Sequence, residues 1–212
     1  MSLLQLDDFK AIFTKLNEMA QANRDYLIEL DSVMGDGDLG LTMAAIFKAG
    51  DEFAQSYTDD DIGSMLMKGG MVMAKAAPST MGTLMATGFM RGGKALRDKT
   101  EVSLNDMALF WRTFTDGIAE RGKSKVGEKT ILDSLDPAAT ALENNSHTSL
   151  KEAFIEAKEA ANKGVEATKD MVAQHGRAAY YQEKSRTVQD PGATVGALIV
   201  AVFADYIAKM DN

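Results

Sequence analysis

The sequence predicts an all-α protein, and two observations support that prediction. Alanine, methionine, lysine and glutamate are frequent, runs of β-branched residues are nearly absent, and only 3 prolines occur in 212 residues. Such a composition favours helices. The chain also has no strand pattern, no interdomain linker and no convincing internal repeat. We therefore expect residues 1–212 to form a single helical domain.

Eight helices are expected, and four of them lie in the N-terminal half. The first, over residues 7–30, carries apolar residues at helical spacing on one face, namely Leu6, Phe9, Ile12, Phe13, Leu16, Met19 and Ala20. The second follows a glycine-rich loop and covers residues 39–57. The third covers residues 60–77 and ends before a proline, and the fourth covers residues 79–97.

The four helices of the C-terminal half have more distinct boundaries. The fifth, over residues 103–122, opens with the sequence SLND, which resembles a capping box. The sixth covers residues 130–143, with Pro137 near its middle as a possible break because proline lacks a backbone N–H. The seventh covers residues 149–173. The eighth covers residues 190–209, with aspartate as its N-cap and proline at its first helical position.

Three segments between these helices do not look helical, namely residues 31–40, 122–129 and 174–190. The last one is long for a plain connector. Because long loops in compact domains tend to be functional, these segments are where we expect a site.

Charge and composition exclude several classes of function. The net charge is −8, so binding to nucleic acid or to an anionic membrane would need a local basic patch, and the longest candidate, residues 121–129, is diluted by glycine. No apolar run approaches the ~20 residues that span a bilayer, and the N-terminus lacks the features of a signal peptide. The absence of cysteine excludes thiolate–metal sites and fits a cytoplasmic protein.

The loop GDGDLG, residues 35–40, matches the pattern G-x-G-x-x-G of dinucleotide-binding folds. That motif needs a strand before its first glycine. Here a helical pattern precedes it, and Asp36 and Asp38 would point carboxylates at a pyrophosphate. An EF-hand also fails, because its closing glutamate would fall on Thr42 or Phe47, depending on which aspartate opens the loop.

A carboxylate set remains, formed by Asp31, Asp36 and Asp38. Gly37 can adopt positive φ and turn its two neighbours toward one point. Hard oxygen ligands with room for water and phosphate suit Mg²⁺, and the N–H groups of the following helix attract an anion. Three carboxylates and a nucleoside diphosphate repel each other unless about two divalent ions lie between them. The alternative is that these aspartates only form turns.

Three further stretches could contact a ligand. The helix that begins at Ser79-Thr80 has a first turn of small residues, which would let a ligand approach its N–H groups, although tight helix packing through Gly82, Ala86 and Gly88 explains the same pattern. Residues 127–138 place a glycine loop before a helix start, which an ordinary N-cap also explains. In residues 176–193 an arginine could face a phosphate, or the loop could simply be solvated. No serine or threonine has a nearby histidine base, so a hydrolase triad has no support.

Together these stretches resemble the L-subunit family of dihydroxyacetone kinases. The resemblance covers almost the whole chain and rests on GDGDLGLTM, EKTILDSLDPA and GRAAYYQEKSRTVQDPGA, in that order. It implies an antiparallel barrel of eight α-helices with ADP or ATP at one mouth and two Mg²⁺ ions on the three aspartates. The residues implied at the nucleotide are Leu39, Gly40, Thr42, Ser79, Thr80, Thr130, Ile131, Arg177, Asp190, Pro191 and Gly192.

The resemblance also implies partners. A phosphoryl donor subunit, the M-type subunit, would regenerate ATP from bound ADP, and a K subunit would hold the ketose that receives the phosphoryl group. The start of the fourth helix departs from the family pattern, because Ala76, Ala77 and Thr80 stand where the family has glycines. The metal loop departs as well, because Leu39 replaces a histidine and Thr42 replaces an asparagine. These changes keep a second hypothesis open, a regulatory nucleotide-binding module that docks on K-like proteins or transcription factors without transferring phosphate. A third is a stand-alone Mg²⁺-dependent hydrolase.

Overall fold

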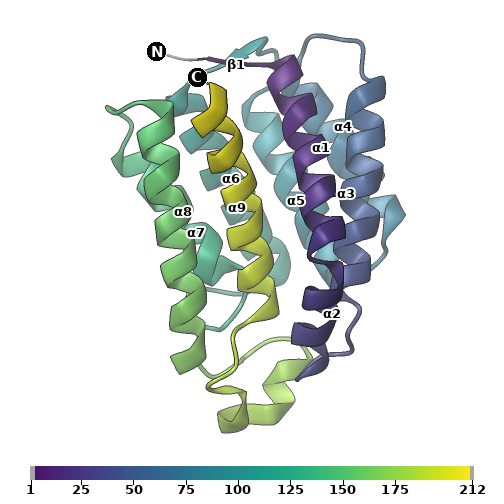
Figure 1. The fold of residues 1–212 in the computed structure, drawn as a ribbon, viewed down its shortest axis with the longest axis vertical. Coiled ribbons are helices and arrows are strands. Elements are labelled where there is room, and N and C mark those ends of the chain that lie inside the picture. Colours follow the sequence, from purple (N-terminus) through teal and green to yellow (C-terminus); the bar gives the residue numbers. More distant parts are fainter. Residues whose placement is uncertain (1–2, 211–212) are drawn as a thin grey trace.

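The computed structural model describes residues 3–210, and most of them belong to helices (Figure 1). The α-helices are α1 (Leu6–Ala22), α2 (Arg24–Ser32), α3 (Leu39–Ser56), α4 (Ile62–Ala76), α5 (Thr80–Ala95), α6 (Leu104–Gly122), α7 (Leu132–Asn144), α8 (Leu150–Ala167) and α9 (Pro191–Met210). Two 3₁₀ segments, η1 (Thr168–Asp170) and η2 (Arg177–Ser185), precede α9. The predicted all-α class is confirmed.

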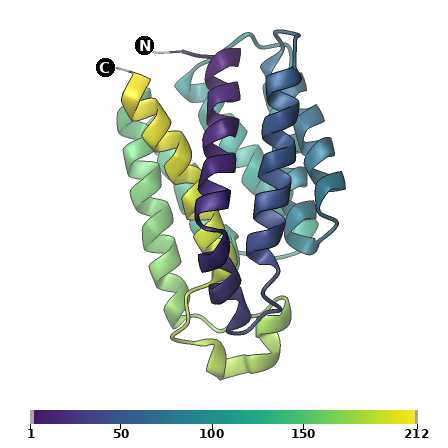
Figure 2. The same cartoon turned by 45° about the vertical axis from the view of Figure 1, so that its right-hand side comes forward.

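The helices form a closed antiparallel ring. Each helix from α3 to α9 packs against the next one along the chain, and α1 packs against both α3 and α9, which closes the ring. Because α2 continues α1 along the chain, the ring has eight positions, as expected for an eight-helix barrel (Figures 1 and 2). The helices α3, α5, α7 and α9 therefore all begin at the same end of the barrel, which we call the mouth.

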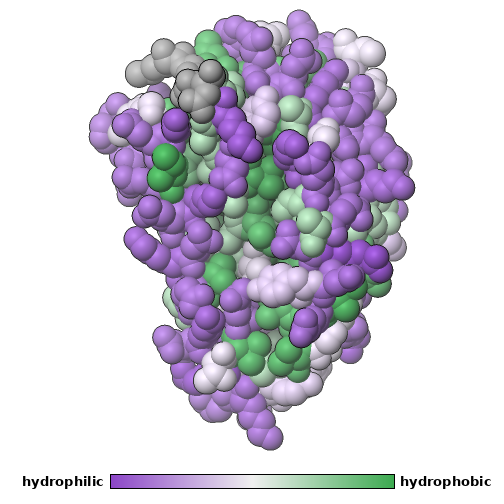
Figure 3. All heavy atoms as spheres, viewed as in Figure 1, coloured by the Kyte–Doolittle hydropathy of each residue, from purple (hydrophilic) through white to green (hydrophobic). Residues whose placement is uncertain are grey.

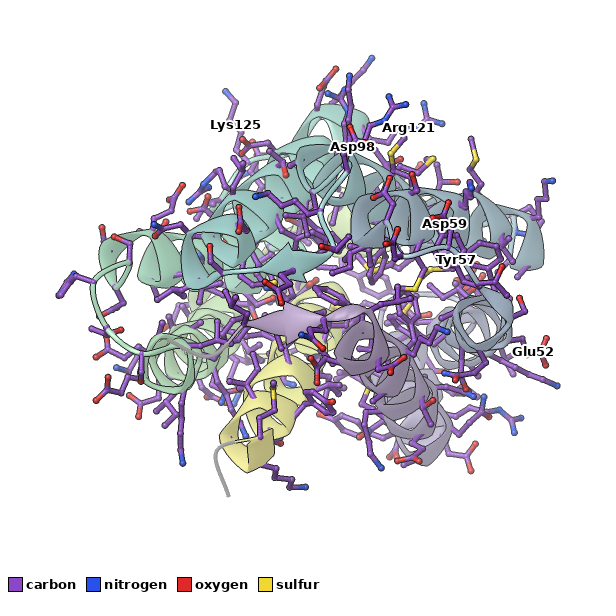
Figure 4. The ribbon with its side chains drawn as sticks, turned by 90° about the horizontal axis from the view of Figure 1, so that it is seen from above. Glu52, Tyr57, Asp59, Asp98, Arg121 and Lys125 are labelled. Carbon is purple, nitrogen blue, oxygen red and sulfur yellow. The ribbon has the colours of Figure 1, made fainter. Side chains whose placement is uncertain are left out.

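The far end of the barrel is covered by a short ribbon that the sequence did not predict. Strand β1 (Leu4–Gln5) pairs antiparallel with β2 (Glu101–Val102), and Leu4 lies opposite Val102. Viewed from above, this ribbon crosses the ring of helices (Figure 4). Both apolar members of the pair are fully buried. Strands of two residues are too short for an alternating pattern to reveal them.

The expectation of a single helix over residues 7–30 is wrong, because the chain breaks at Asn23 between α1 and α2. The side-chain amide of Asn23 donates to the carbonyl of Met19 at 2.8 Å, and its backbone N–H donates to the same oxygen at 3.0 Å. Asparagine competes in this way for backbone groups that a continuing helix would use. The break lets α2 turn toward the mouth.

Pro137 does not break α7, which continues through it to Asn144. The proline lacks the N–H that would reach the carbonyl of Asp133. Gly164 of α8 lies against that carbonyl so closely that a side chain there would clash with it. Close packing of α8 on this first turn keeps the helix continuous despite the missing bond.

The seventh expected helix ends earlier than predicted, at Ala167 rather than near residue 173. The segment expected to be irregular, 174–190, contains η2, which is itself interrupted at Gln182 with φ 49°. Asp190 caps the last helix as predicted, since its side chain accepts the N–H of Ala193 at 2.7 Å.

The interior of the barrel is filled by aromatic side chains. Phe89 lies at the centre, with ring centroids 5.5 Å from Phe13, 6.4 Å from Phe47 and 5.2 Å from Phe114. Burial of each such ring contributes roughly 1.5–3 kcal/mol. Gly88 makes room for them, because a Cβ there would lie 2.8 Å from the ring of Phe114. Tight packing, the alternative interpretation of the small residues in this helix, is therefore correct for Gly88.

The outer surface is mostly hydrophilic, and hydrophobic residues gather in the middle of the face drawn in Figure 3, between α9 and α1. Among the described residues one helix, Pro191–Met210, is long and apolar enough to cross a membrane by length and composition alone. However, 61% of its apolar window is buried inside the barrel, as a core helix requires.

Candidate functional site

A cavity of about 510 Å³ opens at the mouth of the barrel. Residues that precede or begin α3, α5, α7 and α9 form most of its wall. Its volume lies in the range of small-molecule sites. Each helix start carries the positive end of a helix dipole, so four of them around one cavity favour an anionic ligand.

The acidic loop forms one side of this cavity. Asp31, near the end of α2, lies with Asp36 and Asp38 so that one carboxylate oxygen of each is within 4.8 Å of the others. Gly37 has φ +73°, as predicted for the residue that turns its neighbours toward one point. Gly35 is needed for a different reason, since a side chain there would clash with the carboxylate of Asp31.

The electrostatics of this loop fit a divalent cation. Burial raises the pKa of Asp38, and the charges of Asp36 and Asp31 raise it further, while Arg177 lowers it. One cationic group is already present, because Arg177 makes an ion pair with Asp36 at 2.7 Å. Hard oxygen donors that repel one another and face an open cavity are the arrangement that Mg²⁺ occupies in phosphate-binding sites. These residues therefore fit the expected metal.

The start of α3 follows the acidic loop directly. Leu39 lines the cavity and is 5% exposed, so an apolar side chain stands next to the carboxylates. Asp38 precedes the helix without a capping hydrogen bond from its side chain, within the part of the chain that the structure describes. The first N–H groups of α3 are thus left for water or a ligand.

Gly40 and Thr42 do not line the cavity. Gly40 lies against α2, where a side chain would clash with the carbonyl of Arg24. Thr42 is buried and donates its hydroxyl to Ser79 Oγ at 3.4 Å. It therefore reaches the cavity only through that serine.

The start of α5 provides a second cradle. Ser79 caps this helix by accepting the N–H of Gly82 at 3.0 Å, and both Ser79 and Thr80 line the cavity. Farther along the helix Met81 and Leu84 also line it. These two apolar residues were not foreseen, because nothing in the sequence distinguishes them from the methionines and leucines of the core.

The loop before α7 brings Thr130 and Ile131 to the cavity as expected. Its shape depends on Asp133, which is 1% exposed and accepts the N–H groups of Thr130 at 2.7 Å and of Gly127 at 2.5 Å. Neither Asp133 nor the buried Lys129, which also lines the cavity, was expected at the site. The two charged residues lie on either side of the helix start predicted at residue 130, and this position is the signal that could have identified them.

The segment before α9 forms the remaining wall. Arg177, Asp190, Pro191 and Gly192 all line the cavity, as expected. Burial raises the pKa of Asp190 to about 7, while the capping N–H of Ala193 and the charge of Lys129 lower it. At Gly192 a Cβ would lie 3.2 Å from the backbone nitrogen of Ile131, so glycine keeps this wall open.

His175 also lines the cavity, although no role was expected for it. Its Nε2 lies 2.7 Å from a carboxylate oxygen of Glu128, and this contact lowers the pKa of Glu128. The pair links the loop before α7 to the segment before α9. Apart from Gly40 and Thr42, the structure brings every expected site residue to one cavity.

Comparisons with known proteins agree with this geometry. The family model of the DAK2 domain matches residues 33–205. The ADP-binding subunit DhaL of the PEP-dependent dihydroxyacetone kinase of Escherichia coli (strain K12) is 32% identical over 183 residues, which are 85% of this chain and 87% of that protein. The ADP-binding subunit DhaL of the PEP-dependent dihydroxyacetone kinase 2 of Listeria innocua is 27% identical over 214 residues, 99% of each chain.

A solved structure has the same fold. The dihydroxyacetone kinase from C. freundii, in complex with AMP-PNP and Mg²⁺, superposes with a TM-score of 0.71 at 22% identity. The match covers 92% of this chain and 33% of that one, so the chain spans about a third of the longer kinase. The expected resemblance to dihydroxyacetone kinase L subunits is confirmed, and the expected class, a kinase subunit, agrees with the names of these relatives.

Proposed function

Because the chain belongs to the DAK2-domain family, we propose that it is the nucleotide-binding subunit of a kinase that acts on dihydroxyacetone or a similar ketose. In this proposal Mg²⁺-bound ADP is phosphorylated to ATP by an M-type donor subunit of a phosphotransferase system. The phosphoryl group then passes to a ketose held by a K subunit. The names of the relatives, which are ADP-binding subunits of PEP-dependent kinases, support this assignment, and we propose the cytoplasm as its location.

One observation supports it most strongly. Three carboxylates with ligand atoms within 4.8 Å of one another share a cavity with the starts of four helices. A metal ion needs anionic oxygen ligands, whereas a phosphate needs N–H donors and positive charge. The mouth provides both kinds of group within one cavity. Bound Mg²⁺ would neutralise phosphate charge and orient the groups that react.

The residues of this chain then have defined tasks. Asp31, Asp36 and Asp38 hold two Mg²⁺ ions, and the N–H groups at the starts of α3 and α5 face the phosphates. Arg177 lies beside the acidic loop, where it can exchange its pair with Asp36 for a phosphate oxygen. The apolar side of the cavity, with Met81 and Leu84 on it, suits the base. Phosphoryl transfer works largely by such positioning and charge neutralisation.

Titration with Mg·ADP tests the proposal. We expect the wild-type protein to bind, and Asp36→Asn to bind at least about 100-fold more weakly because a metal ligand is lost. Asp25→Asn, which removes an exposed carboxylate of α2 outside the cavity, is the matched control. Calorimetry that gives no heat with the wild type, or equal affinity for wild type and Asp36→Asn, would rule the proposal out.

A regulatory module that binds nucleotide without transferring phosphate is the second candidate, and Leu39 favours it. This side chain places an apolar group in the cavity wall where the resembling family has a polar one. Turnover of ketose in the presence of a K subunit and a phosphoryl donor distinguishes the two functions. Product formation eliminates the regulatory module, and nucleotide binding without product eliminates the kinase subunit.

A further inference from the structure

The segment that forms one wall of the mouth, residues 171–190, has little apolar packing of its own. Ala173 is its one buried hydrophobic residue, and half of its residues are exposed, including Tyr180 at 89%. We call residues 171–190 the strap. In Figures 1 and 2 it crosses the lower end of the barrel beneath α2. Since apolar burial cannot hold the strap in place, polar contacts must do so.

Those contacts gather where the strap leaves and rejoins the barrel. The N–H of Thr187 donates to the carbonyl of Lys169 at 2.7 Å, and the N–H of Asp190 donates to Thr168 Oγ1 at 3.0 Å. These bonds draw both ends of the strap together into a narrow neck. They do not connect the neck to the α6–α7 loop on the other side of the cavity.

Near the start of the strap, Glu128 of that loop pairs with His175 at 2.7 Å, and its carbonyl accepts the N–H of Gln174 at 3.2 Å. At the neck itself Lys129 makes the connection. Its ammonium donates to the carbonyl of Thr168 at 2.5 Å and to the carbonyl of Val188 at 2.6 Å, one on each side of the neck. The residue is 4% exposed and lines the cavity. Burial lowers the pKa of Lys129, while the nearby charges of Asp190 and Asp133 partly oppose this. A buried cation between two neutral carbonyls costs solvation, so its retention needs a reason.

The backbone conformation of Lys129 also indicates that its side chain has a specific role. Its φ is +61°, in the left-handed region that glycine adopts without strain and lysine does not. A glycine would relieve this backbone strain, but it would also remove the ammonium group. The presence of a lysine at this strained position therefore indicates that its side chain is needed.

We infer that Lys129 is a positioning residue that holds the strap against the mouth, and so keeps a bound nucleoside diphosphate from leaving. Through the neck it fixes the wall that carries Arg177 and the start of α9. This inference rests on the proposed function, because it needs a nucleotide in the cavity.

The test compares Lys129→Met with Lys125→Met, a change of an exposed lysine on the same loop. A fluorescent methylanthraniloyl ADP with Mg²⁺ is bound and its release is followed by stopped flow. We expect Lys129→Met to release it at least about tenfold faster, since two hydrogen bonds from a charged group are lost. Release from Lys125→Met should match the wild type.

Limited trypsin digestion provides a readout that needs no nucleotide. The strap carries exposed cleavage sites at Arg177, Lys184 and Arg186. We expect faster cleavage at these sites in Lys129→Met and unchanged cleavage in Lys125→Met. A variant that melts earlier but keeps wild-type release and wild-type cleavage would overturn the inference, because its lysine would then only stabilise the fold.

Lys129→Arg serves as the second variant, because it keeps a buried cation with several donors. If it folds, release between that of the wild type and that of Lys129→Met supports the inference. Failure of both variants to fold overturns it in favour of a purely structural role. If the wild type binds no nucleotide, the proposed function fails, whereas the trypsin result still decides whether Lys129 holds the strap.

Discussion

The two ends of the barrel are built differently. At the far end α4, α6 and α8 each begin with a side-chain cap, in which Asp61, Ser103 and Ser149 accept an N–H of the first turn. The two-strand ribbon covers that end with buried apolar side chains. At the mouth, α3 begins without such a cap within the described residues, and it follows three carboxylates that repel one another.

This difference separates stability from binding. The far end satisfies its own backbone and buries its own apolar groups, so changes there should weaken the fold. At the mouth Ser79 and Asp190 cap α5 and α9, but the acidic loop keeps like charges together and the start of α3 leaves N–H groups available. Changes in the acidic loop should therefore affect ligands more than folding. Four predictions, in decreasing order of expected effect, test this division.

Leu4→Ala should have the largest effect. The side chain is fully buried in the ribbon, and its removal should lower the free energy of unfolding by about 2–5 kcal/mol. Leu3→Ala, at a 41% exposed neighbour, should change it by no more than about 0.5 kcal/mol. Denaturant titration measures both. Equal effects of the two variants would mean that the ribbon does not seal the far end.

Asp38→Asn should act in opposite directions on folding and binding. Burial and the neighbouring carboxylates raise the pKa of Asp38, so its ionised form opposes the metal-free fold, and the neutral variant should melt no earlier than the wild type at pH 7. Its affinity for Mg·ADP should fall by about 100-fold. Differential scanning calorimetry and titration measure the two effects. Early melting would show that the acidic loop stabilises the fold by itself.

Asp190 should make stability depend on pH. Its pKa in the folded protein is raised to about 7 from 3.8, so the folded state holds a proton that the unfolded chain has released. Its contribution is therefore fully present below about pH 4 and is lost as pH rises to about 7. The free energy of unfolding of the wild type, measured relative to that of Asp190→Asn, should fall between about pH 4 and about pH 7 and stay constant at higher pH. A constant difference across that range would contradict the raised pKa, which also depends on nearby Lys129 and Asp133.

Thr42→Val should have the smallest effect. The variant keeps the shape of the side chain and loses one long hydrogen bond, 3.4 Å, to Ser79. We expect a loss of about 0.5–1 kcal/mol in unfolding free energy and little change in the affinity for Mg·ADP. A large loss of affinity would instead show that Thr42 contacts the nucleotide, as the resembling family's pattern implies.

The sequence was sufficient for most of the fold and for the acidic loop, because those features depend on local signals. Composition indicates helices, and a glycine between aspartates indicates a turn that brings the carboxylates together. The break at Asn23 and the continuity of α7 at Pro137 could not be foreseen. The first depends on an amide that competes with the backbone, and the second on the packing of a glycine of α8.

The site was predicted less completely than the fold. Lys129 acts through carbonyl groups that come close only after folding, at sequence separations of 39 and 59 residues. Asp133 accepts N–H groups only three and six residues away, so its role depends on the local shape of the loop. At Gly40 the lack of a side chain serves the packing of α3 on α2, and its expected contact with the nucleotide stays a prediction. Sequence patterns report which chemistry a loop carries, but they do not report which partners other segments bring to it.

The position of the two chain ends has a practical consequence. The first strand, β1, and the end of α9 both lie at the far end, opposite the strap (Figure 1). An added peptide tag, fluorophore or surface tether at either terminus would sit one barrel length from the mouth. A molecule immobilised in this way would present its mouth outward, so binding kinetics could be recorded on a chip without blocking the cavity.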